Sequence, residues 1–321
     1  MGTNTSPDAA GHSRPAVALI AGPTASGKSG LAVAYARWLE QRGERAVIIN
    51  ADSAQVYADL AILSARPSDV EMGGIDHRLF GYIDGAQACS AARWAADARA
   101  EIAAVHAVGA LPILVGGTGL YLQTLLHGIA PIPEIDPAIR EAVRAMPVDQ
   151  THAALAREDP ASAARLNAAD TTRVARALEV VRSTGQPITH WQARKVGGIG
   201  DQITLRPLVL QPPRDWLLER CDQRFALMLE AGALAEVETL LTRQLSPDLP
   251  VMRAIGVPEV AKLLRGEIGH AECLAQGQLA TRQYAKRQYT WFRNQPPESW
   301  KRYTEALSDS DNVDFDILFH N

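Results

Sequence analysis

The segment with the most definite chemistry is residues 22–29, which read GPTASGKS and match the G-x4-G-K-[ST] pattern of a phosphate-binding loop. An apolar run, residues 16–21, precedes it and an apolar-periodic stretch follows it, the strand, loop and helix order that such a loop needs. Backbone N–H groups of a glycine-rich loop can point at a phosphate, and the following helix N-terminus favours an anion. We therefore predict a phosphate site at this loop, with Lys28 adding a point charge and Ser29 a Mg²⁺ ligand. The predicted phosphate-binding residues are Gly22, Pro23, Thr24, Ala25, Ser26, Gly27, Lys28 and Ser29.

A second polar segment, DSAQVY at 52–57, follows an apolar run at 46–50 that reads as a strand. Ligands of open α/β sheets bind outside the carboxyl ends of the strands, which places Asp52 beside the phosphate loop. A carboxylate there suits a general base or a Mg²⁺ ligand, and Asp is equally favoured as a helix N-cap. From position alone these three interpretations of Asp52 remain open.

A third segment, GGTGLY at 116–121, follows the short apolar strand predicted at 111–115. Glycines after a strand let backbone approach a ligand closely, and Thr118 adds a hydroxyl at the same sheet edge. No apolar strand ends directly in the Asp of a Walker B segment, which counts against an ordinary NTP hydrolase.

Composition limits the class of protein. The chain has 321 residues, 47% of them hydrophobic and 21% charged, with a net charge of −4, so any nucleic-acid surface must be local. The three cysteines lie far apart, without metal-ligand spacing or a disulfide framework. No apolar run reaches transmembrane length. We expect a cytoplasmic protein without a membrane partner.

The change in sequence pattern along the chain, from alternating strands and helices to helices alone, predicts its domain organisation. Start signals at Asp136, Asp159 and Asp170 and a stop at Gly185 indicate only helices after residue 131 until a glycine-rich segment at 197–200. The predicted fold is α/β, with a P-loop NTPase-like parallel sheet core and an all-helical insertion domain. Its parts are a disordered tail at 1–14, core at 15–131, the insertion at 132–200, core with a basic C-terminal helix at 201–303, and a loose acidic tail at 304–321.

Two groups of basic residues suggest contact with nucleic acid. Arg173 and Arg176 share a helix face in the insertion. In the helix predicted at 270–294, Arg282, Lys286 and Arg293 fall on one stripe beside Arg287, with aromatic residues interleaved. Cations mixed with aromatics suit phosphate contact and base stacking. A solvated charged face and a core-packed amphipathic helix explain the two groups without nucleic acid.

Together the segments GPTASGKS, DSAQVY, GGTGLY and ATRQYAKRQYTWFR (280–293) resemble the tRNA dimethylallyltransferase, or tRNA isopentenyltransferase, family. DHRLF at 76–80 and ALEVVRSTG at 177–185 also fit, and the resemblance covers about residues 15 to 303. The zinc finger of eukaryotic relatives is absent, so the chain resembles the bacterial type.

Two segments depart from the family pattern. ILSARP at 62–67 stands where the family usually has a Gly-Thr-Ala-Lys type of run. Val257-Pro258 follows Gly256 where a tyrosine and a basic residue are usual. These departures bear on local tRNA or diphosphate contacts and leave the class unchanged.

The resemblance implies transfer of the dimethylallyl group of dimethylallyl diphosphate to N6 of the adenine 3′ of the anticodon in tRNA, with Mg²⁺ and release of pyrophosphate. It implies that Asp52 is the base, that Thr118 helps to place the reacting centre and that Arg253 binds the diphosphate. We expect a monomer that binds the anticodon arm. The implied tRNA-binding residues are Asp52, Ser53, Ala54, Gln55, Thr118, Arg140, Arg173, Arg176, Arg282, Lys286, Arg287 and Arg293.

Other functions share part of this pattern. A P-loop small-molecule kinase has the first segment but does not account for DSAQVY or residues 280–293. An adenylate isopentenyltransferase has the same chemistry on a free nucleotide and less use for a helical insertion. An ATP-regulated RNA-binding protein would bind without turning over an allylic diphosphate.

Overall fold

The computed structural model describes residues 14–307 and 313–319. The tail predicted at 1–14 therefore lies, except for Arg14, outside the described residues. Contacts between residues divide the chain into two compact units, one of residues 1–125 and 200–321 and one of residues 126–199. Each unit is described by itself.

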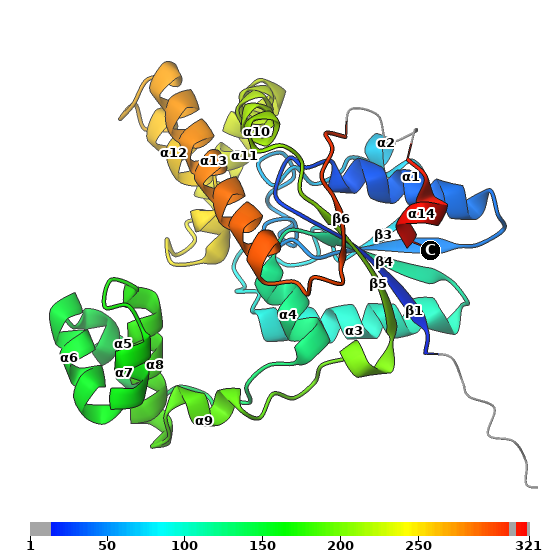
Figure 1. The fold of residues 1–321 in the computed structure, drawn as a ribbon. Coiled ribbons are helices and arrows are strands. Elements are labelled where there is room, and N and C mark those ends of the chain that lie inside the picture. Colours follow the sequence, from blue (N-terminus) through cyan, green and yellow to red (C-terminus); the bar gives the residue numbers. More distant parts are fainter. Residues whose placement is uncertain (1–13, 308–312, 320–321) are drawn as a thin grey trace, which may run out of the picture. The chain divides into compact units, whose positions relative to one another are not determined.

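The first unit is built on a parallel sheet of six strands in the order β3-β2-β4-β1-β5-β6 (Figure 1). The strands are β1 (Ala16–Ala21), β2 (Ala46–Asn50), β3 (Asp76–Arg78), β4 (Leu111–Gly116), β5 (Thr204–Leu210) and β6 (Lys301–Tyr303). Residues 17–21 of β1 are completely buried because that strand lies between β4 and β5. The carboxyl ends of β2, β4 and β1 are therefore neighbours, and the predicted fold class is confirmed.

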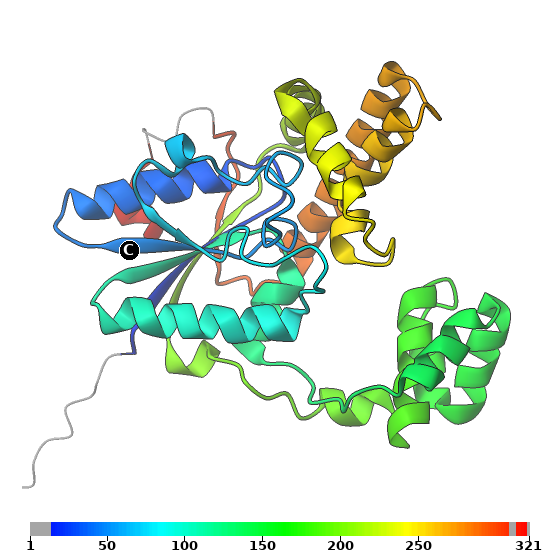
Figure 2. The same cartoon turned by 180° about the vertical axis from the view of Figure 1, so that it is seen from behind.

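Helices cover both faces of this sheet. Figures 1 and 2 show α1 and α14 on one face and α3 on the other, with α10 to α13 gathered near one end of the strands. The helices are α1 (Lys28–Glu40), α2 (Asp69–Met72), α3 (Ala91–Ala107), α4 (Gly119–His127), α10 (Arg214–Met228), α11 (Leu234–Thr242), α12 (Val257–Leu264), α13 (His270–Asn294) and α14 (Phe315–Phe319). A π-helical turn, Leu229–Ala233, joins α10 to α11, and short 3-10 turns lie at Gly200–Gln202 and Pro250–Arg253. The helix predicted at 270–294 is α13 with the same bounds.

The C-terminal segment corrects one prediction. The acidic tail from residue 304 was expected to be loose, yet α14 packs into the core formed by α1 and the sheet. Phe315 and Phe319 lie on one face of α14, with ring centroids 5.3 and 4.1 Å from that of Tyr35. Aromatic burial on one helix face outweighs the acidic composition around it. Residues 308–312 lie outside the described part.

Two short edge strands, β3 and β6, were not predicted. Their sequences, DHR and KRY, lack an apolar run because each strand has only three residues and no more than half-buried side chains. Main-chain pairing with β2 and β5 forms them instead. Local sequence carries little signal for such pairing.

The second unit is all-helical, with α5 (Pro137–Ala145), α6 (Val148–Glu158), α7 (Pro160–Arg165), α8 (Thr171–Thr184) and α9 (Ile188–Gln192). Asp136, Asp159 and Asp170 cap α5, α7 and α8 as their side chains accept hydrogen bonds from backbone N–H groups. A backbone bridge between Ile129 and Val196 joins the two ends of the unit. The unit therefore begins at residue 126 instead of the predicted 132, and ends at 199 instead of 200.

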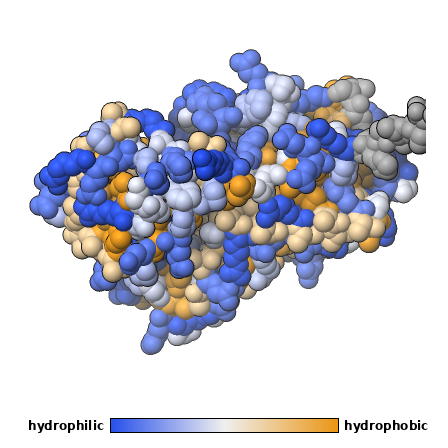
Figure 3. All heavy atoms as spheres, turned by 90° about the horizontal axis from the view of Figure 1, so that it is seen from below, coloured by the Kyte–Doolittle hydropathy of each residue, from blue (hydrophilic) through white to orange (hydrophobic). Residues whose placement is uncertain are grey.

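The face in Figure 3 is mostly hydrophilic, with hydrophobic side chains scattered among the polar ones. Among the described residues, no helix is long and apolar enough to cross a membrane.

Candidate functional site

The phosphate loop lies between β1 and α1, at the carboxyl edge of the sheet. Gly27, with φ 90°, is the N-cap of α1, a conformation that favours glycine. A Cβ on Gly22 would lie 2.7 Å from the carbonyl oxygen of Leu210, so the loop passes too close to β5 for a side chain. The buried Oγ of Ser26 has no hydrogen-bond partner among the described residues. These features give the compact, glycine-dependent turn that a phosphate loop requires.

A cavity of about 390 Å³, here the phosphate cavity, is lined by residues 24–30 together with Asp52, Arg220 and Arg224. The Lys28 Nζ donates a hydrogen bond to the carbonyl oxygen of Pro23 at 2.7 Å. Burial lowers the pKa of Lys28 to about 8, partly opposed by the nearby Asp52 carboxylate. An anion in the cavity would restore the lysine's ordinary preference for its charged form.

Two arginines on α10, which the sequence analysis missed, also reach this cavity. Arg224 donates to the Thr24 hydroxyl, and Arg220 Nε donates to the carbonyl oxygen of Ala25 at 3.2 Å. Burial lowers the pKa of Arg224, and its Nε has no partner among the described residues. Positions 220 and 224 share a helix face, the signal that could have found them. With Lys28 they give the cavity three cationic side chains suited to a multiply charged anion.

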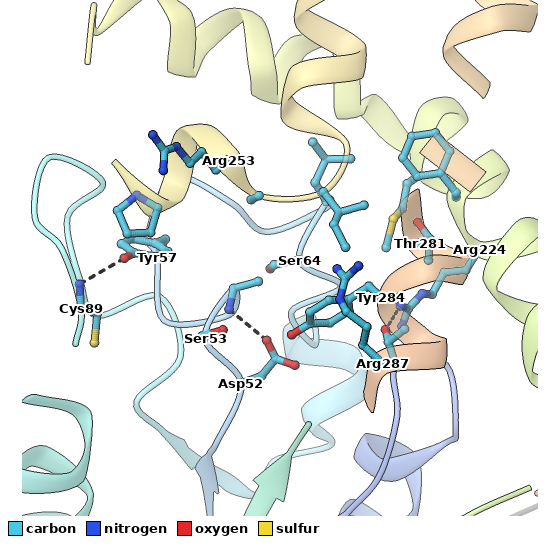
Figure 4. A pocket seen from close by; sticks show the side chains of 18 residues that line it. Asp52, Ser53, Tyr57, Ser64, Cys89, Arg224, Arg253, Thr281, Tyr284 and Arg287 are labelled. Atoms are coloured by element: carbon cyan, nitrogen blue, oxygen red, sulfur yellow. Dashed lines mark hydrogen bonds between the residues drawn. The ribbon is translucent and has the colours of Figure 1, made fainter. Parts of the chain in front are cut away.

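The loop after β2 holds Asp52 at the edge of this cavity. The buried Asn50 side chain accepts a hydrogen bond from the backbone N–H of Asp52 at 2.8 Å. Asp52 Oδ1 accepts one from the N–H of Ala54 at 2.9 Å, an Asx-type turn (Figure 4). Residues 53–56 form turns, so Asp52 caps no helix and that interpretation is excluded.

Thr118 connects the loop after β4 to the loop of Asp52. Its Oγ1 accepts from the backbone N–H of Ser53 at 2.9 Å and donates to the Ser53 Oγ at 3.2 Å. The Tyr284 hydroxyl lies close to both side chains. Burial, followed by the charge of Asp52, raises the pKa of Tyr284, so the phenol stays neutral beside Asp52.

Gln288 on α13 is a further residue that the sequence analysis missed. Its Oε1 accepts a hydrogen bond from the Thr24 backbone N–H at 2.7 Å, and its Nε2 donates to the carbonyl oxygen of Gly117 at 2.8 Å. This buried amide fixes the phosphate loop and the loop after β4 to one helix. The sequence signal was weak because Gln288 stands among cations on a helix that reads as a polar face.

A second cavity, here the adjoining cavity, has a volume of about 310 Å³ and shares Thr24, Asp52, Ser64 and Arg224 with the phosphate cavity. Figure 4 shows Asp52, Tyr284 and Arg287 around this space. Its apolar and aromatic lining includes Tyr57, Leu63, Phe225, Met228, Ile255 and Tyr284. An anion site and an apolar space thus meet at one carboxylate.

Arg253, for which the resemblance implies diphosphate binding, does not line the phosphate cavity, and the role implied for it stays a prediction. Its side chain is 63% exposed, pairs with Asp248 and donates from Nε to the carbonyl oxygen of Pro247. It lines the adjoining cavity instead. The arginines that contact the phosphate loop in this structure are Arg220 and Arg224 of α10.

The other predicted RNA contacts of the first unit differ in their surroundings. Arg287 lines the adjoining cavity, with its guanidinium carbon 5.6 Å from the Tyr284 ring centroid. Arg282 pairs with Asp222 at 2.5 Å, while Lys286 and Arg293 are exposed. Gln55 lines the phosphate cavity and donates to the carbonyl oxygens of residues 64 and 65. Ser53 and Ala54 line the adjoining cavity.

The helical unit carries an arginine cluster of its own. Arg140, Arg144 and Arg176 surround Glu179, whose side chain is only 2% exposed, at N–O distances of 3.9, 3.1 and 3.5 Å. Arg173 is 76% exposed and pairs with Asp170 at 3.4 Å. One buried carboxylate thus offsets part of the charge of three arginines and leaves the cluster cationic.

Comparisons with known proteins agree with this geometry. The model of the IPP transferase family matches residues 55–295. A tRNA dimethylallyltransferase of Sphingopyxis alaskensis is 66% identical over 91% of this chain and 94% of its own length. One of Zymomonas mobilis is 53% identical over 94% and 95%.

Solved structures give the same result. The tRNA isopentenylpyrophosphate transferase of Bacillus halodurans superposes with a TM-score of 0.64 at 32% identity, covering 95% of this chain and 92% of that one. A eukaryotic dimethylallyltransferase, described as acting on tRNA, gives 0.72 at 28% identity over 86% and 69%. From the family match and these identities, the chain belongs to the IPP transferase family.

Proposed function

We propose that this protein transfers the dimethylallyl group of dimethylallyl diphosphate to N6 of the adenine next to the 3′ side of the anticodon in tRNA. The observation that carries the proposal is the meeting of the cationic phosphate cavity and the apolar adjoining cavity at Asp52. Such a site can hold the diphosphate on one side of a carboxylate and an allyl group with an acceptor base on the other.

The chemistry requires a leaving diphosphate and a better nucleophile. The bond between the allylic carbon and the diphosphate oxygen breaks, and its electron pair leaves with pyrophosphate. The loop amides, Lys28 and Arg224 are proposed to stabilise that charge. The adenine N6 forms the new bond to carbon and gives its proton to Asp52, since its lone pair is otherwise delocalised into the ring. Thr118 and Tyr284 keep the loop of Asp52 in place.

The residues present fit a Mg²⁺ ion that arrives with the diphosphate. Ser29 and Asp52 both line the phosphate cavity, and the described residues contain no cluster of three or more His, Cys, Asp or Glu side chains that would hold a metal without substrate. Mg²⁺ keeps water and phosphate oxygens and needs one or two protein ligands. When bound, it would neutralise charge on the diphosphate, with Ser29 as its proposed protein ligand.

tRNA is the proposed acceptor, and the names of the related proteins support this choice. A stacked anticodon-loop base cannot reach Asp52 without being flipped out of the stack. We propose that the arginine cluster, Arg173 and the exposed cations of α13 bind the anticodon arm. We propose that the protein acts as a monomer, and the tRNA acceptor supports a cytoplasmic location.

Label transfer tests the proposal. The protein is incubated with unmodified tRNA, labelled dimethylallyl diphosphate and Mg²⁺, and the label is located in digested RNA by nucleoside mass. The expected product is an N6-modified adenosine at one anticodon-loop position. In parallel incubations, transfer of label to added AMP in place of tRNA would favour an adenylate isopentenyltransferase, and phosphate transfer from added ATP would favour a kinase.

A further inference from the structure

The apolar end of the adjoining cavity is formed by side chains from separate parts of the first unit. Leu63 comes from the loop after β2, Phe225 and Met228 from α10, and Ile255 from the segment before α12. Leu63 is 9% exposed and Phe225 2% exposed, so both are held in a packed wall. Packed side chains yield little to an incoming group, so this wall limits what the cavity admits.

Leu63 packs closely against Gly256. A Cβ built on Gly256 would lie 2.6 Å from Leu63 Cδ2 and 3.2 Å from Phe225 Cε2. The two segments that depart from the family pattern, 62–67 and 256–258, therefore touch each other at this wall. Leucine fills the space next to a position where only glycine fits, which is also held at a φ of 95°.

The backbone of Leu63 is fixed from outside the cavity by Glu236 on α11. Glu236 Oε1 accepts from the N–H groups of Ala61 and Ile62 at 2.6 and 2.7 Å, and its Oε2 accepts from that of Leu63 at 2.9 Å. Glu236 does not line either cavity. A carboxylate that accepts three backbone hydrogen bonds holds such a loop strongly.

The helix that carries Glu236 follows the helix that carries Arg224 across a kink, where Gly232 has a non-helical φ of 111°. The π-helical turn at 229–233 joins them, and a Cβ on Gly232 would lie 3.4 Å from the side chain of Ile62. Arg224 and Leu63 both line the adjoining cavity, Arg224 at the end shared with the phosphate cavity and Leu63 in the apolar wall. When the diphosphate of an allylic donor is bound at Arg224, the hydrocarbon chain has only the space between Arg224 and that wall.

We propose that Leu63, positioned by Glu236, is a specificity-determining residue that restricts the enzyme to the shortest allylic diphosphates. The inference rests on the proposed transfer reaction and adds which residue excludes longer allylic donors. Geranyl diphosphate, one isoprene unit longer, carries the same diphosphate and the same reacting carbon. Its extra unit meets Leu63 and the Phe225 ring.

The test begins with the unaltered protein, with tRNA and Mg²⁺ present. The ratio of kcat/KM for geranyl to dimethylallyl diphosphate is measured by label transfer and is expected to be below about one in a hundred, the range of steric discrimination by one packed wall. A ratio near one would overturn the proposal without any variant. Absence of transfer from dimethylallyl diphosphate would instead contradict the proposed function.

Variants then locate the determinant. Leu63→Ala is expected to raise the ratio at least tenfold, chiefly through a lower KM for geranyl diphosphate. Leu39→Ala, buried on α1 and outside both cavities, is the control for weakened packing and should leave the ratio unchanged. Glu236→Gln places an amide N–H group against the backbone N–H groups of the loop, which should free the loop and raise the ratio. Glu236→Asp keeps a carboxylate and should therefore give a ratio between those of Glu236→Gln and the unaltered protein. A Leu63→Ala protein that transfers dimethylallyl groups with an unchanged ratio would contradict the proposal.

Discussion

The phosphate cavity of the first unit and the arginine cluster of the second both gather positive charge, but they hold it differently. In the phosphate cavity, Lys28 and Arg224 are half-buried and hydrogen-bonded to the phosphate loop. In the cluster, the arginines are 40 to 65% exposed and gather around the buried Glu179. The first arrangement suits one small anion in one geometry, and the second suits a polyanion that can bind in several closely related ways.

The largest effect is expected at the carboxylate between the two cavities. Asp52→Asn keeps the size and the hydrogen bond with Ala54 but cannot accept the N6 proton, so turnover should fall by about 10² to 10⁴. The affinity for tRNA and for the diphosphate should change little. Asp215→Asn, an exposed position on α10, is the matched control. Recovery of the rate with excess Mg²⁺ would mean that Asp52 is a metal ligand.

Lys28 tests the phosphate cavity, the first of the two cationic regions compared above. Lys28→Met keeps the length of the side chain and removes its charge, so diphosphate affinity should fall about 10- to 100-fold, the contribution of a hydrogen bond to a charged group. Titration with unlabelled dimethylallyl diphosphate and Mg²⁺ measures this decrease. Lys262→Met on α12 should bind as the unaltered protein does. Equal affinity in both variants would remove Lys28 from the site.

The pH dependence of binding sharpens the same point. With a pKa of about 8, Lys28 of the unliganded protein loses its proton as pH rises through 8, whereas a bound diphosphate favours the charged amine. Diphosphate affinity should therefore fall by up to about tenfold per pH unit above 8. Over the same interval, up to the ordinary value of 10.5, the unfolded chain binds more protons, so the unliganded fold gains stability. Lys28→Met should lack this decrease. A diphosphate affinity of the unaltered protein that stays constant from pH 7 to 10 would contradict the prediction.

The smallest effects are expected in the arginine cluster and at Arg173. Arg173→Ala or Arg176→Ala should each reduce the dependence of log K on log salt for tRNA binding by about one unit for each phosphate that the variant no longer binds. Arg157→Ala, an exposed arginine of α6 outside the cluster, should leave the slope unchanged. An unaltered slope in both Arg173→Ala and Arg176→Ala would show that this surface does not bind tRNA.

The sequence predicted those parts of the site that local patterns encode. The phosphate loop, Asp52 and Thr118 follow apolar strands whose carboxyl ends must meet at one sheet edge, so their placement followed from the fold class. Arg224 and Gln288 were not predicted as site residues because each lies inside a helix where charged and polar residues ordinarily face solvent. Only the packing of α10 and α13 against the phosphate loop reveals them.

The same limit explains the other differences. The role of Arg253 was implied only by the family resemblance, and in the structure Asp248, nearby in sequence, pairs with its side chain at the surface. The short strands β3 and β6 depend on pairing with distant segments. The helix α14 forms because Tyr35 on α1 offers its aromatic residues a partner nearly three hundred residues away in sequence.

The most direct test of this division of work is a steady-state comparison of Asp52→Asn with the double variant Arg173→Ala/Arg176→Ala, with tRNA varied at saturating diphosphate. Our account predicts that Asp52→Asn lowers kcat with little change in the KM for tRNA. It predicts that the double variant raises that KM and keeps kcat, because these arginines contribute to binding and take no part in the transfer step. A double variant that loses kcat with an unchanged KM, or an Asp52→Asn protein that only raises KM, would contradict it.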